Sequence, residues 1–222
     1  VNAIASVKES DRHLLGESTV YVTLEPCSHY GKTPPCAKLL IDSGVRRVIV
    51  GVQDPFPEVS GRGIAMLRDA GIEVVTGVLE AECEALNRKF MTAHRLGRPY
   101  ITLKWARSAD NFIAATDDAG APQCTRISNS LSSMLAHRER AMNDAIMVGT
   151  RTVAVDNPRL DTRLWPGRNP LKVTFNRNGN LPSGSHLANS SDAVIFDGDE
   201  SLDAVVAALY REHKVSSLLV EG

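Results

Sequence analysis

Residues 25–36 read Glu-Pro-Cys-Ser-His-Tyr-Gly-Lys-Thr-Pro-Pro-Cys, and this stretch decides how the first half of the chain is interpreted. Two cysteines, Cys27 and Cys36, bracket a loop that contains glycine and two prolines. Thiolates are soft ligands that suit zinc, but two of them do not complete a zinc site. The residues alone therefore leave three readings open: a catalytic zinc site, a structural zinc site, or two buried thiols.

The composition is that of an ordinary globular protein, with 222 residues, a formal net charge of −1 and 43% hydrophobic residues. This length is enough for two modest domains. The near-neutral charge gives no support for a nucleic-acid or membrane partner, and no apolar run approaches the length of a membrane span. The four cysteines are widely and unevenly spaced, which argues against a disulfide framework and for a reducing, cytoplasmic compartment.

The first hundred residues alternate between helical and strand patterns. Apolar or β-branched runs at 20–24, 47–52 and 73–78 predict strands. This alternation predicts a three-layer α/β/α domain with a sheet that is mostly parallel. Helical patterns occupy 1–7, 37–43, 63–70 and 80–95.

Glycine and proline in Arg95-Leu96-Gly97-Arg98-Pro99 interrupt the pattern, so we expect one domain over 1–97 and a second over 98–222. The second is again α/β, with a loop rich in Gly, Asn and Ser at 178–191. Its expected strands are 100–106, 112–115, 145–149, 171–175, 193–196 and 218–220, and its expected helices are 130–140 and 202–213.

The segment Tyr21-Val22-Thr23-Leu24-Glu25-Pro26-Cys27, with its nine-residue step to Cys36, resembles the bifunctional riboflavin-biosynthesis deaminase/reductase family. So do Val1-Asn2-Ala3, Gln53-Asp54-Pro55 and Gly61-Arg62-Gly63. The resemblance implies a cytidine-deaminase-like three-layer domain followed by a dihydrofolate-reductase-like α/β domain. In that family His-Ala-Glu stands just before Val-Asn-Ala. We therefore expect the third zinc ligand and the catalytic Glu to precede Val1, and the chain to be truncated at both ends.

The resemblance implies that Cys27 and Cys36 bind Zn²⁺ in the deaminase domain. Three of the implied substrate positions also have a plain alternative: His29 as a loop histidine, Lys32 as a solvated lysine, and Asp54 as a turn former before proline. Phe56 stands where the family usually has Asn. The implied substrate-binding residues are Asn2, His29, Lys32, Thr33 and Asp54.

The strand 145–149 and the Asp156-Asn157-Pro158 turn after it resemble the reductase domain of the same family. There is no Gly-x-Gly-x-x-Gly after the first strand of this half, so NADPH is implied by the resemblance alone. Guanidinium groups meet phosphate in bidentate geometry, which suits a phosphorylated substrate. The implied cofactor-binding residues are Ala106, Thr152, Asp156 and Leu160, and the implied substrate-binding residues are Cys124, Arg140, Arg163 and Glu221.

Several of these positions have structural alternatives. Arg140 lies at the C-terminal end of a predicted helix, where its charge would interact favourably with the helix macrodipole. Asp156 would serve as a turn former, and Ala106 as core packing. The chain also departs from the family at Asn111, at Arg126 and at Cys124, where a Ser is common.

The family resemblance implies zinc-dependent deamination of a phosphorylated diamino-ribosylamino-pyrimidinone, followed by NADPH-dependent reduction of its ribosyl group. It also implies a homo-oligomer joined through the reductase domain. The alternatives are a reductase with an inactive deaminase half, a deaminase for another base, and a structural zinc module. For the chain as written we expect little deamination and weak binding of zinc and NADPH.

Overall fold

The computed structural model describes residues 1–30, 34–56 and 59–222. These residues form two compact units, Val1–Leu96 and Gly97–Gly222. In the described part of the chain, no helix has both the length and the apolar character needed to cross a membrane.

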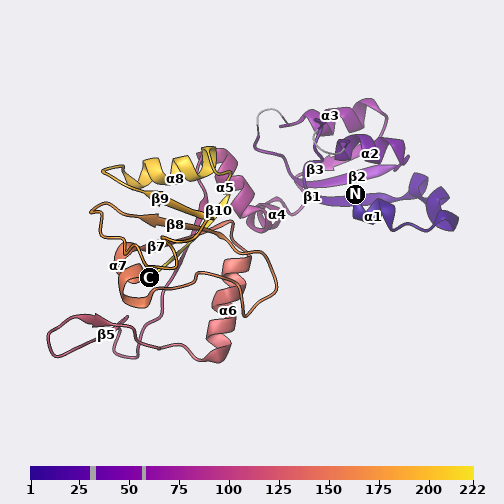
Figure 1. Cartoon of the computed structure of the whole chain (residues 1–222). Helices are drawn as coiled ribbons and strands as arrows, with labels where there is room; N and C mark the ends of the chain where they lie inside the picture. Colours follow the sequence, from indigo (N-terminus) through magenta and orange to yellow (C-terminus); the bar gives the residue numbers. More distant parts are fainter. Residues whose placement is uncertain (31–33, 57–58) are drawn as a thin grey trace. The chain divides into compact units, whose positions relative to one another are not determined.

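The first unit is built on a parallel sheet (Figure 1). Its elements are α1 (Asn2–Ala5), the 3₁₀ helix η1 (Glu9–Glu17), β1 (Thr19–Leu24), α2 (Cys36–Asp42), β2 (Arg47–Val52), α3 (Arg62–Asp69), β3 (Glu73–Thr76), α4 (Glu80–Leu86) and α5 (Arg88–Leu96). The strand order is β1-β2-β3, with Val20 opposite Val48 and Val22 opposite Val50. Successive strand residues alternate between faces, so these valines share one face, which packs against α2 and α3.

The opposite face of this sheet is covered by α4. Gly51 points to that face, and a Cβ added to it would lie 2.2 Å from Cys83 Sγ. Glycine at this position lets the helix approach the strand closely. The first unit therefore has the predicted three layers: α2 and α3, the sheet, and α4.

The prediction of one continuous helix over 80–95 is wrong, because the chain breaks at Asn87. The Asn87 side chain donates from Nδ2 to the Cys83 carbonyl (2.8 Å), which caps α4, and α5 begins at the next residue. Leu86, the last residue of α4, is 72% exposed. The 3₁₀ helix η1 was likewise not predicted, since its sequence is polar and carries little periodicity.

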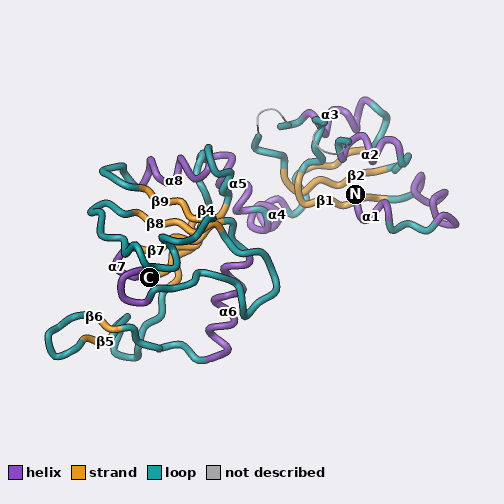
Figure 2. Tube along the Cα trace, in the orientation of Figure 1, coloured by secondary structure: helices purple, strands orange, loops and turns teal. Residues whose placement is uncertain are grey.

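The second unit contains a larger parallel sheet (Figure 1). Its elements are β4 (Tyr100–Lys104), β5 (Ala115–Thr116), β6 (Pro122–Gln123), α6 (Ser130–Ala141), β7 (Ala145–Gly149), α7 (Thr150–Asp156), β8 (Leu171–Phe175), β9 (Ala193–Phe196), α8 (Leu202–Arg211) and β10 (Ser217–Glu221). The strand order is β4-β10-β7-β8-β9, so β10 lies between two strands that precede it in the chain. Long loops join several of these elements (Figure 2).

The central strands of this sheet are buried on both faces. Leu218 belongs to a core cluster with α8 residues such as Val205 and Leu209. Its neighbour Leu219 belongs to a second cluster on the other face, which includes Val153 of α7 and Leu187. A parallel sheet with both faces covered explains why its strands read as almost continuous apolar runs.

The structure corrects two further predictions in this unit. The expected strand 112–115 is a short antiparallel hairpin instead, β5 paired with β6, and residues 112–114 lie outside it. Helix α7 was not predicted as a helix. It follows directly from Gly149, and it ends at Asn157, which takes a left-handed conformation (φ 41°) that asparagine tolerates.

Three neighbouring parallel strands, β4, β10 and β7, end at Lys104, Glu221 and Gly149. In an open α/β sheet, the carboxyl ends of parallel strands form the edge where ligands usually bind. This edge therefore carries a cation, a carboxylate and the turn into α7, and it sets the position of the second candidate site.

Candidate functional site

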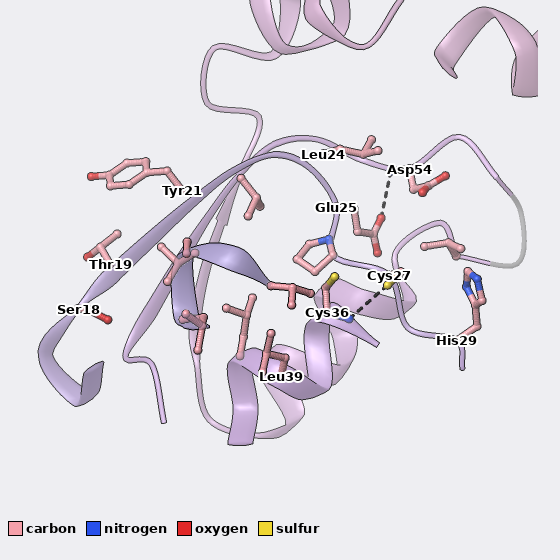
Figure 3. Close-up of a pocket in the computed structure, with 18 of the residues that line it drawn as sticks. Ser18, Thr19, Tyr21, Leu24, Glu25, Cys27, His29, Cys36, Leu39 and Asp54 are labelled. Carbon is pink, nitrogen blue, oxygen red and sulfur yellow. Dashed lines mark hydrogen bonds between the residues drawn. The ribbon is translucent and has the colours of Figure 1, made fainter. Parts of the chain in front are cut away.

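The first candidate site contains the two predicted zinc ligands. Cys27 follows β1 and Cys36 begins α2, and the Cys36 backbone N–H donates to Cys27 Sγ (3.2 Å). Figure 3 shows the two cysteine side chains next to each other. This cavity has a volume of about 970 Å³, and its wall includes His29, Asp54 and apolar side chains of β1 and α2.

The chemistry of the two thiols suits a soft cation. Burial raises the pKa of Cys36, and a hydrogen bond and charge from Cys27 raise it further. Two thiolates held together repel each other, and a bound cation would relieve that repulsion. Within residues 1–30, 34–56 and 59–222, however, no three His, Cys, Asp or Glu residues gather closely enough to hold a metal. The cysteine pair fits zinc as two of its ligands.

The other predicted deaminase residues lie in different surroundings. Asp54 is buried beside the cavity, and its Oδ1 accepts from the Phe56 backbone N–H (2.8 Å). His29 is exposed at the cavity wall (Figure 3). Asn2 is exposed in α1 and does not line the cavity. Lys32 and Thr33 lie outside the described residues.

Phe56, which stands where the family usually has Asn, packs against another aromatic side chain. The Phe56 ring meets the His94 ring edge to face, with 5.3 Å between the ring centroids, and Phe90 also packs against His94. All three side chains line the cavity. An aromatic wall therefore stands where the family usually presents an amide.

Glu25 is a residue of this site that the sequence reasoning did not single out. It is 3% exposed, and its carboxylate accepts four backbone N–H groups. Asp54 and Gly61 donate to Oε2 (3.2 and 2.9 Å), and Gly63 and Ile64 donate to Oε1 (2.9 and 3.2 Å). Because Glu25 stands two residues before Cys27, it ties the start of the cysteine loop to two distant segments (Figure 3).

Gly63 completes this anchor. A Cβ at Gly63 would lie 1.9 Å from the Pro26 carbonyl oxygen, so only glycine allows α3 to approach the loop so closely. A carboxylate directly before Pro-Cys and a later Gly-x-Gly were the available signals. Neither signal pairs the two segments by itself.

The second candidate site lies at the carboxyl edge of the larger sheet. One cavity of about 270 Å³ is bordered by Ala106, Thr152, Asp156 and Leu160, together with Arg140 and Glu221. A neighbouring cavity of about 400 Å³ shares Arg140 with it and adds Arg163 and His137. The structure therefore brings the predicted cofactor residues around one cavity and both predicted phosphate-binding arginines around the other.

Arg140 and Glu221, both predicted to bind substrate, bind each other. Arg140 Nε donates to Glu221 Oε1 (3.0 Å) and Nη2 donates to Oε2 (2.8 Å), while Nη1 donates to the Asp161 carbonyl (3.2 Å). Both side chains are mostly buried, at 12% and 8% exposure. Arg140 therefore already uses its Nε, Nη1 and Nη2 groups within the protein. Arg163 pairs with Asp161 and Lys104 lies 3.8 Å from Glu221, but the Arg163 side chain is about half exposed and is the more accessible cation for a ligand.

Three of the predicted reductase residues have contacts that qualify their roles. The Leu160 side chain is buried in the core, so a ligand would meet this residue through its backbone. Cys124 is exposed, and a hydrogen bond to Asp156 and the charge of that carboxylate raise the pKa of the Cys124 thiol. Ala106 follows β4 and borders the cavity.

The two units match two different domain families. Residues 1–52 match the cytidine and deoxycytidylate deaminase zinc-binding region, and residues 99–222 match the RibD C-terminal domain. The sequence is 40% identical over 208 residues to the riboflavin biosynthesis protein RibD of Aquifex aeolicus, covering 92% of this chain and 56% of that protein. It is 35% identical over 219 residues to RibD of Escherichia coli, covering 89% and 58%. The chain spans about half the length of the curated relatives it matches.

Two solved structures are similar to this one over almost the whole chain. The Thermotoga maritima diaminohydroxyphosphoribosylaminopyrimidine deaminase/5-amino-6-(5-phosphoribosylamino)uracil reductase has a TM-score of 0.83 and 37% identity, covering 99% of this chain and 65% of that protein. Acinetobacter baumannii RibD, form 1, has a TM-score of 0.81 and 29% identity, covering 96% and 65%.

A deaminase-type zinc-binding region followed by a reductase-type α/β domain defines a class of riboflavin-biosynthesis proteins. This confirms the predicted fold class and the resemblance stated from the sequence. The chain belongs to the RibD family.

Proposed function

We propose that this chain carries residues of two consecutive active sites in riboflavin biosynthesis. The first unit (1–97 by the sequence) would serve the zinc-dependent hydrolytic deamination of 2,5-diamino-6-ribosylamino-4(3H)-pyrimidinone 5′-phosphate. The second unit (98–222) would serve the NADPH-dependent reduction of the ribosyl group to a ribityl chain. The likeness to the Thermotoga maritima deaminase/reductase over 99% of the chain carries the proposal.

In the first unit, Cys27 and Cys36 would hold Zn²⁺, which supplies hydroxide at neutral pH when it is bound. The chain's own contribution is to shape the cavity next to the metal. Asp54 presents a buried carboxylate at the wall, His29 presents an imidazole at the rim, and Glu25 holds the loop that carries Cys27. We also propose that the substrate contacts Asn2, Lys32 and Thr33.

Metal binding by the cysteine pair is tested with Co²⁺ as a spectroscopic substitute for zinc. We expect the chain to develop a thiolate-to-cobalt charge-transfer band, and Cys27→Ser or Cys36→Ser to reduce it strongly. Cys83→Ser is the matched control, since Cys83 packs between α4 and the sheet and should leave the band unchanged. Because we expect weak binding, the titration extends to millimolar Co²⁺, and the absence of a band at that concentration would refute metal binding by this pair.

In the second unit, NADPH supplies hydride when it is bound. Thr152, Asp156, Ala106 and the backbone at Leu160 would hold it against the carboxyl edge of the sheet. Arg163 would meet the substrate phosphate, and the Arg140–Glu221 pair with Cys124 would orient the substrate. The apolar side chains under the cavity would exclude water from the hydride path.

NADPH binding is followed by the change in its fluorescence. We expect saturable binding that NADP⁺ competes away and that Thr152→Val and Asp156→Asn weaken several-fold. Asp199→Asn changes an exposed carboxylate outside the cavity and serves as the control. A titration without saturation would contradict the cofactor assignment.

We also propose that the protein is cytoplasmic and forms a homo-oligomer through the second unit. Four free cysteines suit a reducing compartment. Along the edge strand β4 and just beyond it, Ile101, Leu103 and Trp105 are 36%, 62% and 58% exposed, which is unusual for apolar side chains on one strand. Light scattering of the wild type and of Leu103→Glu tests this surface, and a monomeric wild type would contradict it.

A further inference from the structure

His137 in α6 is buried without a hydrogen bond for one of its nitrogens. The residue is 4% exposed, and its Nδ1 has no hydrogen-bond partner among the described residues. The nearest carboxylate oxygen, Asp161 Oδ1, is 4.0 Å away, which is too far for a hydrogen bond. Buried polar side-chain atoms are nearly always paired, so this nitrogen requires an explanation.

The surroundings of His137 identify what would pair with it. His137 lines the cavity of about 400 Å³ together with four cationic side chains, at Lys104, Arg126, Arg140 and Arg163. Two carboxylates offset part of this charge, because Glu221 pairs with Arg140 and Asp161 pairs with Arg163. Four cations against two carboxylates leave an excess of two positive charges, which matches one phosphate monoester dianion.

The alternatives to an anion fit these observations less well. A cationic ligand would be repelled by the excess charge, and an apolar ligand would leave Nδ1 unpaired. Burial first, and then Arg140 and Arg163, lower the pKa of His137, while the Asp161 carboxylate and backbone act in the opposite direction. The net lowering favours a neutral imidazole at neutral pH. A neutral imidazole protonated at Nδ1 offers one hydrogen bond to an acceptor oxygen, and a phosphate dianion has only acceptor oxygens.

We propose that His137 donates a hydrogen bond from Nδ1 to the phosphate group of the sugar-phosphate substrate in the second unit. The proposal rests on the proposed function and adds to it a contact that selects phosphorylated over unphosphorylated substrates. Arg163 supplies charge at this cavity, and His137 supplies a fixed direction, because its ring is held by burial in α6.

The phosphate has two possible sources, the 5′-phosphate of the substrate and the 2′-phosphate of NADPH, and three probes separate them. Ribose 5-phosphate, NADP⁺ and NAD⁺ are titrated separately into the full chain, with the histidines ¹⁵N-labelled. We expect ribose 5-phosphate to shift the Nδ1 resonance of His137. We also expect His137→Phe to lower the affinity for ribose 5-phosphate about ten- to a hundredfold, which corresponds to the loss of one hydrogen bond to a charged group. The preference for NADP⁺ over NAD⁺ should stay as in the wild type.

Two conservative variants protect the test against a folding artefact. Asn at 137 presents an amide donor close to the position of Nδ1, whereas Gln presents one near Nε2, so His137→Asn should retain most of the affinity and His137→Gln should lose it. His213→Asn is the control, because His213 is exposed and outside the cavity. Circular dichroism establishes that each variant is folded.

The outcomes separate this inference from the proposed function. If the wild type binds ribose 5-phosphate and His137→Phe binds it equally well, the inference fails while the substrate assignment stands. The inference is also overturned if His137→Asn and His137→Gln lose the same affinity for ribose 5-phosphate, or if the variants lose affinity only for NADP⁺. If the wild type fails to bind ribose 5-phosphate at millimolar concentration, both the phosphate site and the inference fall.

Discussion

Replacing Glu25 with Gln should loosen the anchor of the cysteine loop. In the wild type each carboxylate oxygen accepts two backbone N–H groups, at 2.9 to 3.2 Å. A Gln amide has one oxygen, so in either orientation its NH₂ group faces two donors that lose their acceptor. Hydrogen bonds to a charged group contribute about 1.5–3 kcal/mol each, so the expected cost is about 3–6 kcal/mol. That is a large part of the about 5–15 kcal/mol that stabilises a typical domain.

The loss is measured by amide hydrogen exchange at Asp54, Gly61, Gly63 and Ile64, because this readout does not require the two units to unfold together. A cost of 3 kcal/mol corresponds to exchange faster by about a hundredfold. Glu73→Gln is the matched control: Glu73 pairs with Arg47 at the surface, with both side chains about half exposed, and such pairs contribute about 0–1 kcal/mol. Acceleration of less than about fivefold at the four amides would refute the anchoring role of the carboxylate.

Gly63→Ala should destabilise the first unit by about 3 kcal/mol or more, since its Cβ would meet the Pro26 carbonyl oxygen at 1.9 Å; Gly16→Ala, whose nearest contact is at 3.9 Å, should be neutral or slightly stabilising in the same thermal melt. Glu221→Gln should lower the free energy of unfolding of the second unit by about 3–5 kcal/mol in urea, because it leaves the mostly buried Arg140 guanidinium without its carboxylate. Arg168→Gln removes a 76% exposed partner of Asp144 and should cost less than about 1 kcal/mol. Equal losses in the two variants would contradict the role of burial. Because the pKa of His137 is lowered in the folded state, the unfolded state takes up a proton below pH 6.5 more readily than the folded state does. The second unit should therefore lose stability as the pH falls below 6.5, by up to about 1.4 kcal/mol per pH unit, and His137→Phe should reduce that slope in urea melts at pH 5–7.

Much of the strand pattern was predictable because the parallel strands are buried on both faces. The strands 47–52, 145–149, 171–175 and 193–196 agree with β2, β7, β8 and β9. Most of these segments are largely apolar, and 171–175 alternates apolar residues with Lys and Thr. The helix 37–43 differs from α2 by one residue at each end. Local pattern and local structure agree in these elements.

The parts that were not predictable depend on residues far apart in the chain. The Glu25 anchor joins residues 29 to 39 positions apart, and the Arg140–Glu221 pair spans 81 positions. No local periodicity encodes such pairings. The helix break at Asn87 is local, but it depends on a side-chain hydrogen bond that competes with an otherwise continuous helical pattern.

The central position of β10 has a consequence for how the second unit is made. Strand β4 emerges from the ribosome long before its partner, because Tyr100 pairs with Ser217 and Lys104 pairs with Glu221. Until β10 is synthesised, β4 and β7 have no strand between them, so the sheet cannot close progressively as the chain grows. Such non-local pairing gives a high contact order and slow folding, and it leaves strand edges open to aggregation during synthesis. The first unit, whose strands pair in the order in which they are made, has no such delay in its sheet.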